Sequence, residues 1–189
     1  MGKLFASQVF GKQDLAERLL AKGEYENCTF KNVDFAESDL SEFIFAECEF
    51  LDCNLSLTKL IKTTLRDVKF TGCKMLGLRF DTCNQFALAF GFEQCTLNHS
   101  SFYQTKLKKM DFKDTQLHEV DFTGCDLSAA VFDNCDFKDA TFDNTILEKA
   151  DFRTSYNYTI DPETNRLKKA KFSIAGLPGL LEKYGIEVE

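Results

Sequence analysis

The chain has 189 residues, which is enough for one domain with a substantial core and too few to require two. Its 23 basic and 30 acidic side chains give a formal net charge of −7, which disfavours direct binding of nucleic-acid phosphates or an anionic membrane through the average surface. The sequence has no apolar run near the ~18 residues of a membrane span and no signal-peptide pattern at its start, so we expect a soluble, cytoplasmic protein.

From Phe10 to Tyr25 the chain carries only an irregular five-residue spacing of apolar side chains, at Leu15, Leu20 and Tyr25. A regular form of this spacing occupies residues 25–155. Because the open end of a repeat array exposes unpaired backbone groups, we expect residues 1–24 to form an N-terminal cap over the regular repeats.

Within residues 25–155 a large apolar residue, here called the centre of a repeat, stands at every fifth position in two uninterrupted series. The centres of the first series are Phe30, Phe35, Leu40, Phe45, Phe50, Leu55, Leu60, Leu65, Phe70, Met75 and Phe80. Those of the second are Phe92, Leu97, Phe102, Leu107, Phe112, Leu117, Phe122, Leu127, Phe132, Phe137, Phe142, Leu147 and Phe152. Two positions before most centres stands a small or modest side chain, such as Cys28, Val33 or Thr58.

A period of five excludes an amphipathic helix, because five steps of ~100° place successive apolar residues about 140° apart around the axis. It also excludes one flat strand, because an odd period sends successive centres to opposite faces. The small residue and the following centre are two apart, as on a strand, so both point inward. We therefore predict that the chain bends once per repeat and that the other three positions face water.

Two repeats show the pattern most clearly, Val120-Asp121-Phe122-Thr123-Gly124 and Ala150-Asp151-Phe152-Arg153-Thr154. They match a consensus of Ala, Asp or Asn, Leu and two free positions, so the chain resembles the pentapeptide-repeat family over roughly residues 15–155. This resemblance implies an all-β fold, the right-handed quadrilateral parallel β-helix, a solenoid in which four repeats close each square coil.

Residues 81–91 carry two residues more than the five-residue spacing requires. We expect a bulge or a small corner loop here, within a single domain of residues 1–189. Asn84, Gln85 and Phe86 could form a recognition loop, whereas an insertion tolerated at a corner of the solenoid is the simpler interpretation.

The sequence predicts no catalytic residues, no cofactor site and no metal site. All eight cysteines occupy the small inward position of a repeat, where a thiol acts as a compact apolar side chain, and Cys83 is assigned to an irregular repeat centred near Gln85. No CxxC pair occurs. His99 and His118 fall at outward positions away from the thiols. A square rod has flat walls and no cleft in which catalytic groups converge, so we predict that the protein is not an enzyme.

Residues 156–189 are expected to form a last coil and a C-terminal helix. Asp161-Pro162 interrupts the repeats, and Ala170 and Phe172 restore the small and large pair. Helical spacing between Pro178 and Gly185, followed by alternation, gives an apolar set of Leu177, Leu180, Leu181, Tyr184, Ile186 and Val188. This set either caps the last coil of a monomer or forms a homodimer. The dimer is preferred, because the set carries more apolar surface than is needed to cover one coil end.

Acidic side chains are concentrated in residues 111–151, where eleven acids and three bases give a net charge of −8. Five of these acids stand directly before a centre, where the family consensus places Asp for structural reasons. Six stand at free outward positions and are the candidate contacts with a basic partner: Asp114, Glu119, Asp133, Asp139, Asp143 and Glu148.

A narrower resemblance rests on Thr159-Ile160-Asp161-Pro162-Glu163-Thr164-Asn165-Arg166 and Leu180-Leu181-Glu182-Lys183-Tyr184-Gly185-Ile186, which are similar to the ends of microcin B immunity and quinolone-resistance pentapeptide proteins. Those proteins are dimeric rods that imitate DNA and bind type II topoisomerases. The resemblance implies that the acidic walls bind DNA gyrase and protect it from inhibitors, without direct contact to nucleic acid or membrane. The alternative is a β-helical scaffold for an unrelated protein partner, with acidity serving solubility.

Overall fold

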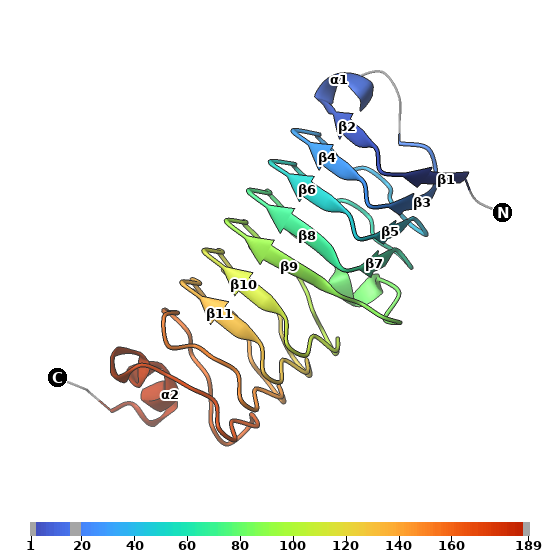
Figure 1. Ribbon diagram of the computed structural model, residues 1–189. Coiled ribbons are helices and arrows are strands. Elements are labelled where there is room, and N and C mark those ends of the chain that lie inside the picture. The colour runs from blue at the N-terminus through green and yellow to red at the C-terminus, as the bar shows by residue number, and fades with distance from the viewer. Residues whose placement is uncertain (1–2, 16–19, 187–189) are drawn as a thin grey trace.

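The computed structural model describes residues 3–15 and 20–186. The chain winds into a right-handed, four-sided parallel β-helix, and Figure 1 shows its strands stacked as rungs along a rod with the two ends of the chain at opposite ends. The fold class implied by the resemblance to the pentapeptide-repeat family is therefore confirmed, and so is the short C-terminal helix. Every helix in the described residues is too short or too polar to span a lipid bilayer.

Two parallel sheets contain the named strands. The four-stranded sheet has the order β1-β3-β5-β7 and comprises β1 (Lys3–Ala6), β3 (Gly23–Glu26), β5 (Ile44–Ala46) and β7 (Thr64–Arg66). The seven-stranded sheet has the order β11-β10-β9-β8-β6-β4-β2 and comprises β2 (Val9–Gly11), β4 (Thr29–Lys31), β6 (Glu49–Leu51), β8 (Val68–Thr71), β9 (Phe90–Glu93), β10 (Asp111–Lys113) and β11 (Val131–Asp133). Phe30 pairs with Phe50, so one coil contains 20 residues.

The rod has four flat walls, numbered here in chain order within a coil. Wall I is the seven-stranded sheet with its extension through Asp151 and Lys171. Wall II follows the bridges of Asp34, Asn54, Lys74, Thr96, Gln116, Asp136 and Tyr156, and wall III those of Asp39, Lys59, Arg79, Ser101, Asp121 and Thr141. Wall IV is the four-stranded sheet, followed by Lys106, Asp126, Ile146 and Arg166. Each of these bridge residues except Tyr156 precedes a centre, and the two outward residues after that centre belong to the same wall.

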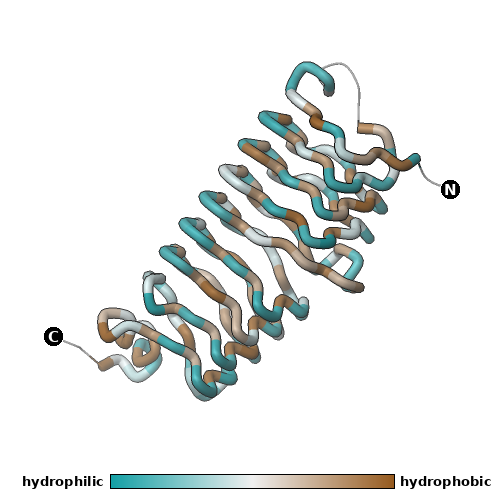
Figure 2. The backbone as a smooth tube through the Cα atoms, viewed as in Figure 1, coloured by the Kyte–Doolittle hydropathy of each residue, from teal (hydrophilic) through white to brown (hydrophobic). Residues whose placement is uncertain are grey.

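Columns of centres fill the interior. Behind wall I, nine phenylalanines stack with neighbouring ring centroids between 4.7 and 5.4 Å apart: Phe10, Phe30, Phe50, Phe70, Phe92, Phe112, Phe132, Phe152 and Phe172. Figure 2 shows the resulting alternation of hydrophobic and hydrophilic residues along each coil. Because each ring packs against the next coil, stability is approximately a sum of nearest-neighbour contacts.

The corners are tight turns that place one residue in the left-handed region of the backbone. In the repeat centred on Phe122, the amide of Cys125 donates to the Phe122 carbonyl at 3.0 Å and Gly124 has a φ of 67°, the geometry of a type II turn. Most equivalent positions hold residues other than glycine, such as Asp114 and Glu119 with φ of 49° and 54°. Non-glycine residues at the corners therefore adopt a left-handed backbone conformation, which is unfavourable in free energy for L-amino acids.

The insertion changes the register of the rod. Across it, partners lie 22 residues apart, as in the pairing of Phe70 with Phe92. A short 3-10 helix, η1 (Phe80–Thr82), precedes a loop in which Leu88 is buried and Gln85 is exposed, so Leu88 and not Gln85 fills the interior. The wall IV ladder stops at β7 and resumes at the bridge between Lys106 and Asp126.

The N-terminal segment begins the coil register earlier than residue 25. β1 pairs with β3 and β2 pairs with β4, and the rings of Phe5 and Phe10 stack on Tyr25 and Phe30 at 4.7 and 5.1 Å. A short helix, α1 (Lys12–Leu15), follows β2. The expected cap therefore contributes two strands of the solenoid, because Phe5 and Phe10 are themselves centres five residues apart.

The C-terminal segment forms one more rung and then turns into helix. Lys171 bridges to Asp151 and Phe172 stacks on Phe152 at 5.4 Å. The helical elements η2 (Ile174–Gly176), α2 (Pro178–Leu181) and η3 (Glu182–Tyr184) follow, and Gly185 ends them with a φ of 61°. The Ile160 amide donates to the Gly179 carbonyl at 2.9 Å, which ties the helix to the last coil.

Candidate functional site

The six candidate acids stand at outward positions, as expected, but on four different walls. Asp114 and Asp133 lie on wall I, Glu119 and Asp139 on wall II, Asp143 on wall III and Glu148 on wall IV. Five of them are exposed and Glu148 is partly buried. The structure thus brings together two pairs of candidates and separates the others around the rod.

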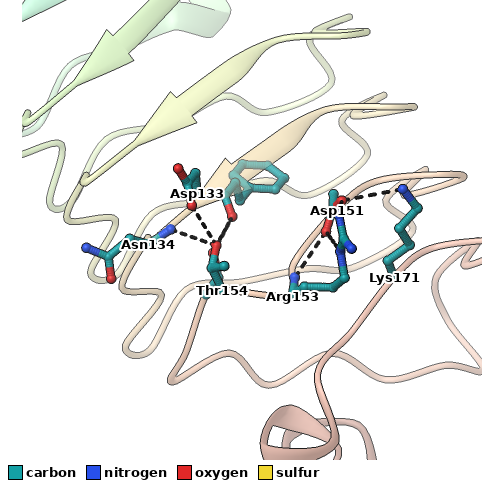
Figure 3. A network of polar contacts seen from close by, with 8 residues as sticks. Asp133, Asn134, Asp151, Arg153, Thr154 and Lys171 are labelled. Carbon is teal, nitrogen blue, oxygen red and sulfur yellow. Dashed lines mark hydrogen bonds and ion pairs between the residues drawn. The ribbon is translucent and has the colours of Figure 1, made fainter.

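Polar contacts between neighbouring coils hold several of these carboxylates in place. Asn134 donates to Asp114 at 2.7 Å, and the hydroxyl of Thr154 donates to Asp133 at 2.9 Å, as Figure 3 shows for the second contact. Arg166 donates to Glu148 at 2.6 Å. The acids of wall I are therefore oriented by the coil below and still face solvent.

Four of the five acids that precede a centre form the turn that follows. Asp121, Asp126, Asp136 and Asp151 each accept the backbone amide two residues further on, at 2.9 to 3.2 Å. Arg153 also donates its guanidinium to Asp151, and this hydrogen bond, opposed by partial burial, lowers the pKa of the Asp151 carboxyl to about 2. These carboxylates stay charged while they hold the corner.

The two histidines stand on adjacent coils of wall II, and each lies beside a carboxylate. The imidazole of His99 is 3.3 Å from Glu119, and that of His118 is 2.8 Å from Asp136. Burial opposes the shift, but the hydrogen bonds from His118 and Asn157 hold the pKa of Asp136 below its ordinary value. Both contacts join neighbouring coils of wall II.

All eight cysteines are buried and unpaired, which agrees with their assignment to the interior. Six of the thiols donate to backbone carbonyls, as in the 3.4 Å contact from Cys53 to Phe30. Burial raises the pKa of Cys48 to about 11 and those of Cys83, Cys125 and Cys135 to about 12. Across the described ranges, no three His, Cys, Asp or Glu side chains converge in a group that could hold a metal ion.

The C-terminal apolar set divides into a buried and an exposed part. Leu180 packs against the core and Leu181 is partly buried, whereas Leu177, Tyr184 and Ile186 are 43, 51 and 56% exposed. Val188 lies outside the described residues. Ile174 is 88% exposed at the same end and was missed, because it precedes the helical spacing used to find the others.

A groove of about 910 Å³ separates the last coil from the C-terminal helix. Asp139, Tyr156, Glu182 and Ile186 contribute to its lining, so it joins one candidate acid to the exposed apolar set. Its floor includes Tyr158, whose hydroxyl is buried and lacks a hydrogen-bond partner among the described residues.

Charge is divided between the walls in a way that summing along the sequence does not show. Within residues 111–151, walls I to III carry nine acids and two bases, a net charge of −7, and wall IV carries the remaining −1. Immediately outside this window, wall IV bears two lysine-rich rungs, at residues 106–109 and 166–169. Reading the sequence with a period of 20 would have found them.

The chain matches the family model described as "Pentapeptide repeat region" over residues 24–91 and 85–152. The structure is similar to that of trypsin-treated QnrB1, a plasmid-mediated fluoroquinolone resistance protein, over 100% of both chains with 17% identity and a TM-score of 0.65. HetL, a pentapeptide repeat protein involved in heterocyst differentiation regulation from the cyanobacterium Nostoc sp. strain PCC 7120, matches over 89% of this chain and 84% of its own, with 15% identity and a TM-score of 0.40. No curated protein matches this sequence.

Proposed function

Because the chain belongs to the pentapeptide-repeat family, we propose that it is a non-enzymatic binding protein whose acidic walls occupy the DNA-binding groove of a type II topoisomerase such as DNA gyrase. In that position it would protect the enzyme from inhibitors that act on the DNA complex. The proposal places both proteins in the cytoplasm, where eight unpaired thiols stay reduced.

The observation that carries the proposal is the charge density of walls I to III. Their net charge of −7 is spread over two coils, or about 10 Å of rod at ~4.8 Å per coil. Duplex DNA carries one negative charge per ~1.7 Å, so the two densities are comparable. A groove that is lined with lysine and arginine to hold duplex would attract this part of the rod.

The fixed carboxylates of wall I add to this argument. Asp114 and Asp133 are held by Asn134 and Thr154 of neighbouring coils, so little side-chain entropy is lost when a partner binds them. On wall II, Glu119 and Asp139 stand at the same position of neighbouring coils, so these two carboxylates repeat at the ~4.8 Å spacing of the coils.

A supercoiling assay with DNA gyrase, in the presence and absence of the protein and of a gyrase poison, tests the proposal. The variant with Asp133→Asn, Asp139→Asn and Asp143→Asn should require about ten-fold more protein for the same effect, and affinity should fall steeply with salt. The variant with Glu37→Gln, Glu47→Gln and Glu49→Gln is the matched control, because it removes three exposed acids from upstream coils.

A second candidate function is a scaffold for an unrelated protein. It is favoured by the distribution of the six candidate acids over four walls, which no single flat partner surface can contact. An absence of any effect on supercoiling or on drug action at micromolar protein would support the scaffold and contradict the gyrase proposal.

We also propose that the C-terminal end forms a homodimer. Ile174, Leu177, Tyr184 and Ile186 expose apolar surface there, and a second copy would cover it. Light scattering of the whole chain should give twice the monomer mass, and truncation before Leu177 should give the monomer. The double variant Tyr184→Ser, Ile186→Ser keeps the helix and should also be monomeric, whereas a dimer in both variants would place the interface elsewhere.

A further inference from the structure

Wall IV differs from the other walls in its charge. Between residues 106 and 169 it exposes seven basic and two acidic side chains, a net charge of +5 on a chain whose total is −7. The basic residues are Lys106, Lys108, Lys109, Lys149, Arg166, Lys168 and Lys169, and the acidic ones are Asp126 and Glu148.

Most of this positive charge lacks a carboxylate partner. Lys108 lies 3.1 Å from Asp126 and Arg166 lies 2.6 Å from Glu148, which uses both acids of the wall. The other five lysines make no ion pair within residues 3–15 and 20–186. An anionic chain would therefore contact these five lysines by displacing only water, because no existing ion pair has to break first.

Three of the free lysines form one column. Lys109, Lys149 and Lys169 each occupy the left-handed position of their turn, with φ of 59°, 61° and 62°, and the Lys149 amide donates to the Lys168 carbonyl at 3.0 Å. At ~4.8 Å per coil, the column spans about 14 Å. That length is enough for several phosphates of one strand running along the rod, since the phosphates of a duplex strand stand ~3.4 Å apart along the axis and those of an extended strand stand further apart.

The insertion adds an apolar feature beside the first lysine rung. A groove of about 360 Å³ lies where the wall IV ladder is interrupted, and Val68, Leu88, Phe90 and Met110 contribute its apolar lining. Lys108 and Lys109 stand on its rim, together with Lys69, Asp67 and Asp111. The groove therefore places a small apolar surface beside Lys109, which makes no ion pair among the described residues.

An exposed aromatic ring stands in the same loop. Phe86, two residues before Leu88, is 81% exposed. Its backbone is fixed, because Asn84 accepts the Phe86 amide at 3.0 Å and the Gln85 side-chain amide donates to the carbonyls of Phe80 and Cys83. A rigid loop that presents a solvent-exposed ring is a stacking platform that loses little entropy on binding.

We propose that wall IV binds single-stranded nucleic acid, with an unpaired base stacked on Phe86 or seated in the adjoining groove and the phosphates on Lys109, Lys149 and Lys169. A partner that fits this wall must combine flat apolar rings with regularly spaced negative charge, and a single strand has both. An acidic peptide supplies the charge but not the rings. In duplex nucleic acid the bases are paired inside the helix, so they are not free to stack on Phe86.

This inference does not depend on the topoisomerase proposal, which rests on the charge of walls I to III. It differs from the expectation from the sequence, in which the overall charge of −7 disfavours direct contact with nucleic acid through the average surface. The overall charge is the sum over all four walls, whereas the nucleic-acid strand would contact only wall IV.

Fluorescence anisotropy with a labelled oligo-thymidine measures the interaction across a series of salt concentrations. Lys109→Gln, Lys149→Gln and Lys169→Gln together should weaken binding and reduce the slope of log affinity against log salt by about 2, at roughly 0.7 per phosphate contact for single strands. Phe86→Ala should weaken binding about five-fold or more with the slope unchanged, because stacking is not an ionic contact.

The matched control carries Lys31→Gln, Lys59→Gln and Lys74→Gln, which removes the same charge from exposed positions on walls I, III and II. Its affinity and slope should stay close to those of the unmodified protein. Equal weakening by the two lysine triples, or no binding at low salt, would overturn the proposal. Equally tight binding of polyglutamate, unaffected by Phe86→Ala, would overturn it in favour of an acidic protein segment.

Discussion

Phe132 stacks on Phe152 one coil further along wall I, with ring centroids 4.7 Å apart. On the other side its ring lies 4.9 Å from that of Phe112. The phenyl ring of Phe132 is thus a middle member of a continuous column and has aromatic neighbours along the axis in both directions.

Phe132→Ala is expected to lower the free energy of unfolding by about 3 to 5 kcal/mol, because the ring is 1% exposed and its removal leaves a cavity that the neighbouring coils cannot close. Urea unfolding followed by circular dichroism measures the change. Phe86→Ala deletes the same atoms from an 81% exposed ring and should change the free energy of unfolding by less than about 0.5 kcal/mol. Similar losses in both variants would contradict the stacked column.

Asp151→Asn should make the protein less sensitive to acid. The pKa of Asp151 is lowered from 3.8 to about 2 by the Arg153 hydrogen bond, so the folded state binds this proton later than the unfolded state does. The stability that the carboxylate contributes is present above pH ~4 and is lost as the pH falls towards 2. The denaturation midpoint of the variant should therefore fall less across this range than that of the unmodified protein.

Asp139→Asn is the control for this measurement, because it removes an exposed carboxylate from another corner. It should keep the acid sensitivity of the unmodified protein. If Asp151→Asn showed the same pH profile as Asp139→Asn, the Arg153 hydrogen bond would contribute nothing to stability.

Asp114→Val should destabilise the protein by about 1 kcal/mol or more relative to Asp133→Val. Asp114 has a φ of 49°, where a β-branched side chain is strongly disfavoured, whereas Asp133 ends strand β11. Each variant also loses one hydrogen bond to a neighbouring coil, so the comparison isolates the backbone effect. Thermal unfolding of the two variants side by side tests this, and an equal melting temperature would argue against strained corners.

The thiols should resist alkylation in the native state. All eight lie in the interior at 0 to 5% exposure, and burial raises the pKa of Cys83 to about 12, so the reactive thiolate is scarce and shielded. Mass spectrometry after iodoacetamide treatment should find unmodified native protein and eight modifications after unfolding in denaturant. Rapid labelling of the native protein would mean that the coils open readily.

The five-residue period was sufficient to predict the interior, because local alternation sets each inward position. The four-sided closure of the coil came from the resemblance to the pentapeptide-repeat family. The period failed where the chain departs from that alternation. Gln85 occupies the expected centre but is exposed, because Leu88 can fill the interior once two residues are inserted. Phe5 and Phe10 were assigned to a cap, because the repeats between Phe10 and Tyr25 are irregular.

The candidate site was harder to predict, because residues five apart belong to different walls and residues 20 apart share one. Asp139 and Asp143 are close in sequence yet face different directions, on walls II and III. Lys109 and Lys149 are 40 residues apart and share one column. The charge of a short sequence segment therefore describes one coil as a whole. The charge of one wall is found only by summing residues that lie 20 apart.

The constant 20-residue register also separates the length of the rod from the chemistry of its surfaces. Loss of residues 112–131 would bring Phe132 into the place of Phe112, and every later residue would keep its wall. Duplication of one such unit would extend each surface by the same step. Descendants of this gene could thus lengthen or shorten their reach by whole turns and inherit the pattern of each face intact.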